Sequence, residues 1–149
     1  THLAHPLGVK AFEYRRVMED YSGSDWVDDA CYGLAMCYCN GSLKPAYDQT
    51  PSQMAVDAID DFATRYPQDA RVAELKAKRG EAREKIADQR LATAKFYEKR
   101  REFSSARIYY ELLAKDFSDT GAAQTAKQWL DKNAGVTHVG LKYGVAEAK

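Results

Sequence analysis

Apolar side chains recur along the chain at steps of three and four residues, which is the spacing of one face of an α-helix. The first such set is Ala11, Tyr14, Val17, Met18 and Tyr21. The pattern predicts helices over 9–21, 25–39, 51–66, 70–100, 104–117 and 120–132. No segment alternates apolar and polar residues in steps of two, so we expect an all-α protein.

The predicted helix over 70–100 is long for a chain of 149 residues. It contains no proline and a single glycine, Gly80, and consists mostly of the strong helix formers Ala, Lys, Arg, Glu and Leu. We expect either one long central helix or two nearly coaxial helices that meet at Gly80.

Three helix ends share one pattern. An aromatic residue ends each helix, a polar turn of three residues follows, and another helix begins; these aromatics are Tyr21, Tyr66 and Phe117. A unit that recurs in this way is typical of a solenoid of helical hairpins. In the best-defined unit, Ala94, Tyr97, Ala106, Tyr110 and Leu113 occupy the small, aromatic and apolar positions of a tetratricopeptide repeat.

The sequence therefore predicts an all-α, tetratricopeptide-like helical-hairpin solenoid, an α–α superhelix with one long central helix. We expect this domain to span 1–133, with repeat units at about 9–39, 40–86 and 87–133. The remaining residues, 134–149, contain three glycines among apolar residues. We expect a C-terminal tail there that is extended or bound to a partner.

The three cysteines, Cys31, Cys37 and Cys39, lie close together in one predicted helix. Their odd number argues against a disulfide framework. None of the three histidines stands at metal-binding spacing from them, because these lie near the chain ends, at His2, His5 and His138. The cysteines are interpreted as small core hydrophobes. An enzyme or metal protein built around them is the alternative.

Lys and Arg total 22, as do Asp and Glu, so the formal net charge is zero and gives no overall electrostatic reason to bind nucleic acid or an anionic membrane. The longest apolar stretch, residues 30–39, is too short to span a bilayer. The chain has no nucleophile-elbow motif and no glycine-rich phosphate loop. We therefore expect no catalytic residues, no metal and no cofactor.

The charge is unevenly distributed along the chain. Residues 1–75 hold 6 basic and 12 acidic side chains, whereas residues 76–101 hold 10 basic and 4 acidic ones. The basic segment ends in Lys99, Arg100 and Arg101. These cations are interpreted either as a solvated helix end that complements the helix dipole or as a docking site for an acidic partner.

Two acidic triplets lie in the first half of the chain, each with spacing i, i+3, i+4. Such spacing places three carboxylates on one helix face. They are interpreted as solvating groups that also favour a helix N-terminus, and attraction to a basic partner is the alternative. The triplets are Asp25, Asp28 and Asp29, and Asp57, Asp60 and Asp61.

Four segments resemble the BamD family of outer-membrane assembly lipoproteins. They are Tyr47-Asp48-Gln49-Thr50, AIDDFATRYP over 58–67, LATAKFYEKRREF over 91–103 and YELLAKDFSDT over 110–120. The resemblance spans about 12–130, and its most specific parts are Asp48-Gln49-Thr50 and the Phe-Tyr-x-Lys-Arg run that ends at Arg100. The family usually has glycine after that Lys-Arg pair, where this chain has Arg101. It also has a longer N-terminal half that begins with a lipidated cysteine.

The resemblance implies a non-catalytic periplasmic scaffold at the inner face of the outer membrane of a Gram-negative-type bacterium. Its partners would be the POTRA domains of the barrel-insertase protein and accessory lipoproteins, with no nucleic acid. Membrane association would come only from those partners or from a lipid anchor that this chain lacks. The family arginine that faces an acidic POTRA residue corresponds to Arg100. The expected partner-binding residues are Tyr97, Lys99, Arg100, Arg101, Phe103 and Arg107. A tetratricopeptide adaptor or structural subunit of another envelope complex is the alternative function.

Overall fold

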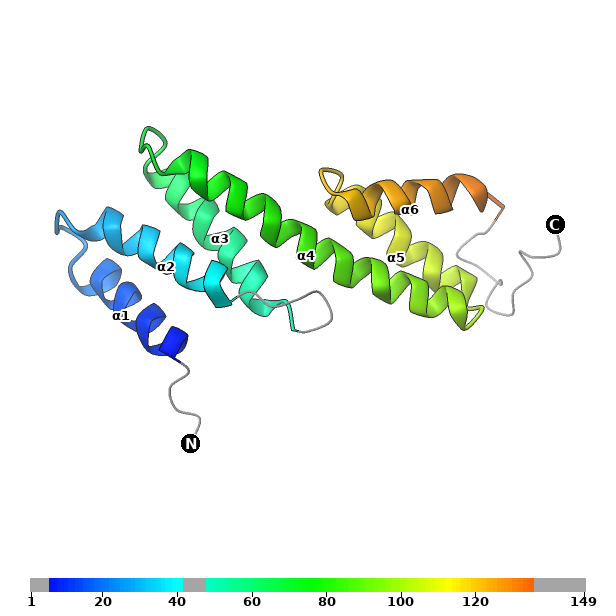
Figure 1. The fold of residues 1–149 in the computed structure, drawn as a ribbon, viewed down its shortest axis with the longest axis horizontal. Coiled ribbons are helices and arrows are strands. Elements are labelled where there is room, and N and C mark those ends of the chain that lie inside the picture. Colours follow the sequence, from blue (N-terminus) through cyan, green and yellow to red (C-terminus); the bar gives the residue numbers. More distant parts are fainter. Residues whose placement is uncertain (1–5, 42–47, 136–149) are drawn as a thin grey trace. The chain divides into compact units, whose positions relative to one another are not determined.

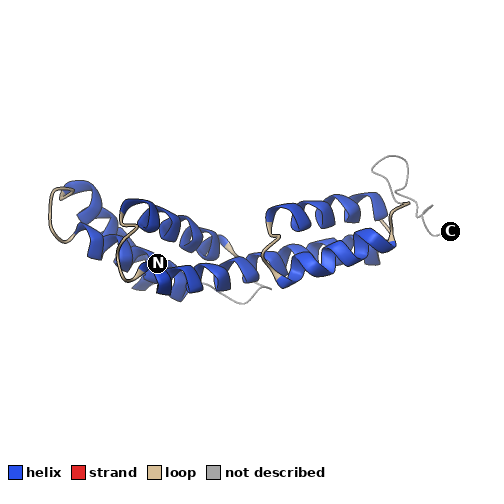
Figure 2. Cartoon of the chain, turned by 90° about the horizontal axis from the view of Figure 1, so that it is seen from above, coloured by secondary structure: helices blue, strands red, loops and turns tan. Residues whose placement is uncertain are grey.

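The computed structural model describes residues 6–41 and 48–135, and these residues form six α-helices (Figure 1). They are α1 (Pro6–Asp20), α2 (Val27–Gly41), α3 (Thr50–Arg65), α4 (Val72–Lys99), α5 (Phe103–Asp116) and α6 (Gly121–Lys132). The described residues contain helices and turns but no strand (Figure 2). The all-α prediction is confirmed, and each helix begins and ends within three residues of its predicted position.

Successive helices pack as hairpins in a tetratricopeptide-like arrangement, within two compact units that we describe separately. Unit 1, Thr1–Lys85, contains α1, α2, α3 and the first part of α4. Unit 2, Ile86–Lys149, contains the rest of α4 together with α5 and α6. Because α4 continues through Gly80, the long segment is one helix rather than two.

The core of unit 1 lies where α2, α3 and the start of α4 meet. Its buried members are Val27, Cys31, Ala35, Ile59, Phe62 and Leu75. A second cluster between α1 and α2 contains Ala11, Leu34 and Cys37. Burial raises the pKa of the Cys31 and Cys37 thiols, because a thiolate is poorly solvated there. This environment favours the interpretation of these cysteines as core hydrophobes.

The contact between α1 and α2 depends on Gly33. A Cβ atom at this position would lie 2.9 Å from Cδ1 of Tyr14 and closer still to the rest of that ring. Next to this contact, the Arg15 guanidinium donates a hydrogen bond to the Tyr38 hydroxyl and lies over the Tyr38 ring. The absence of a side chain at Gly33 therefore allows the Tyr14 ring to pack directly on α2.

The three aromatic helix ends form the same turn. At each one the aromatic N–H donates to the carbonyl four residues earlier, and the aromatic carbonyl accepts from the N–H three residues later. The second of these bonds measures 2.8 Å at Tyr21, 3.0 Å at Tyr66 and 2.9 Å at Phe117. The repeated sequence pattern thus corresponds to one repeated hydrogen-bonding pattern at the helix end.

The Asp48-Gln49-Thr50 motif forms the start of α3. The Asp48 carboxylate accepts hydrogen bonds from the Thr50 N–H at 3.0 Å and from its hydroxyl at 2.8 Å. These bonds hold the pKa of Asp48 below its usual range. Gln49 is buried, and its side-chain oxygen accepts a hydrogen bond from the Ser52 hydroxyl. In this chain the motif therefore positions the N-terminus of a helix.

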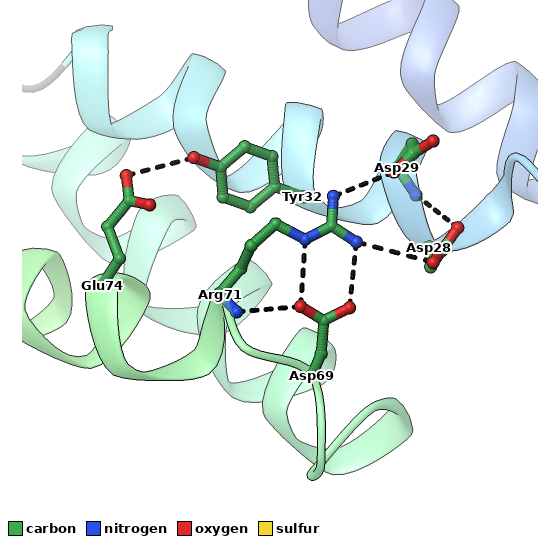
Figure 3. A network of polar contacts seen from close by, with 6 residues as sticks. All are labelled: Asp28, Asp29, Tyr32, Asp69, Arg71 and Glu74. Carbon is green, nitrogen blue, oxygen red and sulfur yellow. Dashed lines mark hydrogen bonds and ion pairs between the residues drawn. The ribbon is translucent and has the colours of Figure 1, made fainter.

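Two members of the first acidic triplet, Asp28 and Asp29, are ion-paired across the fold. Arg71, between α3 and α4, binds Asp29 at 2.9 Å, Asp69 at 3.0 Å and Asp28 at 3.5 Å (Figure 3). Asp69 and, to a smaller extent, Asp29 raise the pKa of Arg71, and the hydrogen bonds from Arg71 lower the pKa of Asp69. Asp28 and Asp29 also lie in the first turn of α2, where negative charge is favourable.

The aromatic rings beside this network are part of the same contact. The Arg71 guanidinium lies 4.9 Å from the centre of the Tyr32 ring and 5.4 Å from that of Phe62. The Tyr32 hydroxyl donates to Glu74 at 3.1 Å (Figure 3). Arg71 and Tyr32 thus join α2 to the beginning of α4.

The second acidic triplet also has basic partners within unit 1. Asp60 binds Arg79 of α4 at 2.7 Å, and Asp61 binds Arg65 one helical turn later at 3.0 Å. Two carboxylates of each triplet therefore neutralise basic side chains of this chain, which is a role that the sequence analysis did not assign to them.

The core of unit 2 combines buried alanines with larger buried side chains, among them Tyr110. Ala94, Ala106 and Ala123 are fully buried, and Tyr110 is 1 % exposed. The Tyr110 ring stacks on Trp129 of α6 with 4.4 Å between ring centres. Small residues thus allow α4, α5 and α6 to approach closely, as the repeat pattern predicts.

No helix among the described residues is long and apolar enough to cross a membrane. The three histidines and most of the predicted tail, residues 136–149, lie outside the described residues. The expectation that residues 134–149 are extended or partner-bound therefore stays a prediction.

Candidate functional site

The turn that joins α4 to α5 carries the predicted docking residues, and it begins with an unusual helix end. The Glu102 N–H donates to the Tyr97 carbonyl at 3.0 Å, and the Arg101 N–H donates to the Glu98 carbonyl at 2.9 Å. These two bonds define a Schellman motif, in which one residue adopts a left-handed backbone. That residue is Arg101, with φ of 61°.

Glycine is the residue that this position favours, because it has no Cβ to crowd the backbone. The chain keeps the left-handed conformation although the residue is arginine. Arg101 stands where the BamD pattern has glycine. The side chain at this turn therefore differs from the pattern, but the backbone keeps the conformation that suits glycine.

Arg100 is held in place by two neighbours. Its Nε donates to Glu102 Oε1 at 2.8 Å, and its guanidinium lies 5.4 Å from the centre of the Phe96 ring. The side chain is nevertheless 60 % exposed. An arginine that is oriented in this way and open to solvent is suited to pair with a carboxylate.

The remaining charges of the turn increase its positive character. Lys99 and Arg101 are exposed. Of the two flanking carboxylates, Glu102 binds Arg100, and Glu98 accepts a hydrogen bond of 2.6 Å from the Tyr110 hydroxyl. The turn therefore presents three successive cations with carboxylates that already have partners.

The aromatic residues of the prediction lie beside the turn. The Tyr97 ring stacks on Tyr109 of α5 with 5.1 Å between centres and only 7° between planes. A hydrogen bond with Tyr109 raises the pKa of Tyr97. Phe103 is the first residue of α5 and is half-buried. The stack of Tyr97 and Tyr109 thus joins α4 to α5, and both Tyr97 and Phe103 leave part of their surface exposed.

Arg107 differs from the other predicted residues. It donates to Glu111 at 2.8 Å and to the carbonyl of Asn133, just after α6, at 3.2 Å. The structure thus places five of the six predicted residues in the last turn of α4, the connecting turn and the start of α5. It places Arg107 further along α5, where it contacts the end of α6.

Two features of this region were missed in the sequence. Phe96 is 53 % exposed and supports Arg100, and Glu102 is the ionic partner of Arg100. The four-residue spacing of Phe96 and Arg100 is a signal that could have identified the first contact. The ion pair between Arg100 and Glu102 depends on the geometry of the turn, and no pattern of residues in the sequence predicts it.

The chemistry of the site is that of binding. In residues 6–41 and 48–135 no group of His, Cys, Asp and Glu side chains converges as a metal site. Burial also raises the pKa of Cys39, as it does for the other two thiols. The cationic turn can form ion pairs and hydrogen bonds with carboxylates, and its aromatic rings can contact apolar groups.

The chain matches the model of a known protein family. A family model named YfiO, described as an outer membrane lipoprotein, matches residues 9–136. None of the curated proteins compared with the chain matches it significantly. The matched range covers every residue of the candidate site and most of the six helices.

Proposed function

Because the chain belongs to the YfiO (BamD) family of outer membrane lipoproteins, we propose that it is a scaffold subunit of the machinery that assembles β-barrels in the outer membrane. The family is non-catalytic and acts in outer membrane assembly. The proposed partners are the POTRA domains of the barrel insertase and accessory lipoproteins of the same complex. The proposed place of action is the periplasmic face of the outer membrane.

The proposed contact surface comprises Tyr97, Lys99, Arg100, Arg101, Phe103 and Arg107. The main observation that supports this proposal is that the Arg100 side chain is exposed to solvent and is oriented by Glu102 and Phe96. A side chain that is already oriented loses less conformational entropy when it binds. Arg100 is therefore the residue from which we expect the largest contribution to partner binding.

The simpler interpretation, a solvated helix end, explains less of this geometry. Each cation near a helix C-terminus contributes about 0.3–1 kcal/mol through the helix dipole. That effect requires neither the ring of Phe96 under Arg100 nor the left-handed backbone of Arg101. Binding to the carboxylates of a partner would explain why three cations occur together at this turn.

The proposed scaffold is a stack of three repeat units at about 9–39, 40–86 and 87–133. The identical hydrogen-bonded turns at Tyr21, Tyr66 and Phe117 support this division, since each turn ends one unit's helix in the same way. In such a stack the α4–α5 turn lies within the last unit, and the tail over 134–149 follows it.

Co-purification tests the function and the site together. The chain is isolated from native membranes in mild detergent, and the proteins that accompany it are identified by mass spectrometry. Arg100→Glu is compared with Lys127→Glu, which reverses an exposed charge on α6. We expect a POTRA-containing barrel protein to accompany the unchanged chain and Lys127→Glu but not Arg100→Glu.

The other outcomes separate the alternatives. Retention of the barrel protein by Arg100→Glu would refute the proposed site but not the function. A different, stoichiometric set of companions would assign the chain to another envelope complex, as an adaptor or structural subunit.

A further inference from the structure

The exposed hydrophobic side chains of unit 2 gather on the hairpin of α4 and α5. Among the described residues of this unit, the large hydrophobic side chains that are exposed are Phe96 of α4, at 53 %, and Ile108 and Leu112 of α5, at 43 % each. Ile108 and Leu112 are four residues apart, so they lie on the same face of α5. Scattered exposed hydrophobic residues are normal on a protein surface, whereas a contiguous group of them marks a binding site.

Two half-buried tyrosines connect these side chains into one surface. The Phe96 ring meets the Tyr97 ring edge-on with 5.4 Å between centres, and the Tyr97 ring stacks on Tyr109 with 5.1 Å between centres. Tyr109 precedes Leu112 by three residues and is therefore its neighbour on α5. Aromatic and aliphatic side chains thus form a surface that extends from α4 to α5.

This surface is already ordered. The rings of Tyr97 and Tyr109 are only 7° from parallel, and the Phe96 ring lies between Tyr97 and the Arg100 guanidinium. Side chains that are fixed before binding lose little conformational entropy when a partner covers them. An exposed hydrophobic side chain also gains its transfer free energy only when it is removed from water. Covering this surface is therefore favourable for binding.

The edge of the surface indicates the chemistry of the partner. The Arg100 guanidinium lies over the Phe96 ring, 5.4 Å from its centre, and the Arg100 side chain is 60 % exposed. Tyr97 belongs both to this surface and to the proposed contact residues of the α4–α5 turn. The apolar surface is therefore continuous with the cationic turn. A segment that binds both presents apolar side chains to the rings and a carboxylate to Arg100.

We propose that this surface, the α4–α5 platform, binds an apolar segment of the docked POTRA domain that also carries a carboxylate for Arg100. This inference rests on the proposed docking function. It adds to that function an apolar contact along α5, which the pattern of charges does not reveal. The platform comprises Phe96, Tyr97, Ile108, Tyr109 and Leu112.

The test measures affinity and stability on the same variants. Binding of the full chain to purified POTRA domains of the insertase from the same bacterium is measured by calorimetry, and thermal unfolding by circular dichroism. A double variant, Ile108→Gln with Leu112→Gln, removes the aliphatic part of the platform and leaves Arg100 and its neighbours unchanged. Phe12→Gln is the matched control, because it replaces a side chain that is 65 % exposed on α1 in unit 1.

We expect the double variant to bind about tenfold more weakly, because two aliphatic side chains no longer leave water on binding. The heat-capacity change on binding should become less negative for the same reason. The salt dependence of binding should stay unchanged in the double variant, whereas Arg100→Glu should reduce it. Phe12→Gln should bind like the unchanged chain. All these variants should unfold near the temperature of the unchanged chain, since the replaced side chains are exposed.

The results distinguish this inference from the proposed function. If Arg100→Glu abolishes binding and the double variant binds like the unchanged chain, the inference is wrong and the docking function stands. If the unchanged chain does not bind POTRA domains, the proposed docking is refuted and this inference with it.

Two further outcomes would assign the platform to another occupant and overturn the inference. A markedly lower unfolding temperature of the double variant would show that Ile108 and Leu112 are covered within the chain. A free chain that sediments as a dimer, together with a monomeric double variant, would show that a second copy of this chain covers them.

Discussion

The hydrogen bond between Tyr110 and Glu98 joins the core of unit 2 to the end of α4, next to the cations of the candidate site. Removing it tests how much this bond stabilises unit 2. Tyr110 is 1 % exposed, and its hydroxyl donates to the Glu98 carboxylate at 2.6 Å. Tyr110→Phe deletes that hydroxyl alone and keeps the ring that stacks on Trp129. The packed volume of unit 2 is therefore almost unchanged.

The expected cost follows from the charge and the exposure of the acceptor. A hydrogen bond to a charged group contributes about 1.5–3 kcal/mol. Glu98 is half-buried, so in the variant its carboxylate can still be solvated in part. We expect the lower end of this range, a decrease of about 1.5 kcal/mol in the free energy of unfolding of unit 2 at neutral pH.

The assay uses the fluorescence of Trp129 during unfolding in urea. The chain has only one other tryptophan, Trp26, which is 70 % exposed in unit 1. A Trp26→Phe background makes Trp129 the sole reporter and confines the signal to unit 2. Glu98→Gln completes a double-mutant cycle, in which Tyr110→Phe should cost less because the remaining bond is neutral.

The pH dependence gives an independent check. Burial and the bond to Glu98 raise the pKa of Tyr110 in the folded chain. In the unfolded chain the hydroxyl loses its proton near its ordinary pKa of about 10, so above that pH the folded state binds more protons and stability falls as pH rises. The part of this loss that Tyr110 contributes should disappear in Tyr110→Phe, whereas the part that comes from tyrosines such as Tyr97, whose pKa is also raised, should remain. The reasoning would be refuted if Tyr110→Phe cost less than about 0.5 kcal/mol, or if it cost as much in the Glu98→Gln background as in the unchanged chain.

Three further predictions concern unit 1. Arg71→Met should lower the stability of this unit by about 1–2 kcal/mol in urea unfolding followed by circular dichroism, because it removes the guanidinium stacked on Tyr32 and Phe62. Arg65→Met, which breaks an exposed ion pair within one helix, should change the stability of unit 1 by less than about 0.5 kcal/mol. If Arg65→Met and Arg71→Met lowered the stability equally, the proposed importance of the Arg71 network would be contradicted. Gly33→Ala should lower the stability of the chain by about 1 kcal/mol, because the added Cβ clashes with the Tyr14 ring. In a Tyr14→Ala background the clash is absent, so the same substitution should raise the stability by a similar amount, because alanine favours a helix more than glycine does. Thermal unfolding of the unchanged chain, the two single variants and the double variant checks this reversal of sign. Cys31 and Cys37 should react with iodoacetamide much more slowly in the native chain than in urea, because burial raises their pKa, and comparable rates by mass spectrometry would show that they are accessible.

Local interactions explain why the helices could be predicted so closely from the sequence. Helix propensity and the spacing of apolar residues act within a few residues of each other, so they are fully contained in the sequence. The aromatic helix ends were recognisable for the same reason, since each turn is closed by bonds between residues three or four apart. The cluster of Lys99, Arg100 and Arg101 was visible because the three residues are consecutive.

Contacts between distant residues could not be predicted in this way. Arg71 pairs with Asp29, 42 residues earlier, and Arg107 with the carbonyl of Asn133, 26 residues later. Nothing in the spacing of the acidic triplets distinguishes a solvated face from one that binds an arginine of another element. Which carboxylate meets which cation depends on how the helices pack.

The sequence by itself thus determined six helices, their hairpin order, the family and the basic turn. Only the tertiary structure decided that Glu102 and Phe96 orient Arg100, that Arg107 contacts the end of α6, and that Arg101 adopts a left-handed backbone. The physical reason is that a helix forms from local dihedral preferences, whereas the environment of a side chain is set by neighbours that only the packed chain brings together.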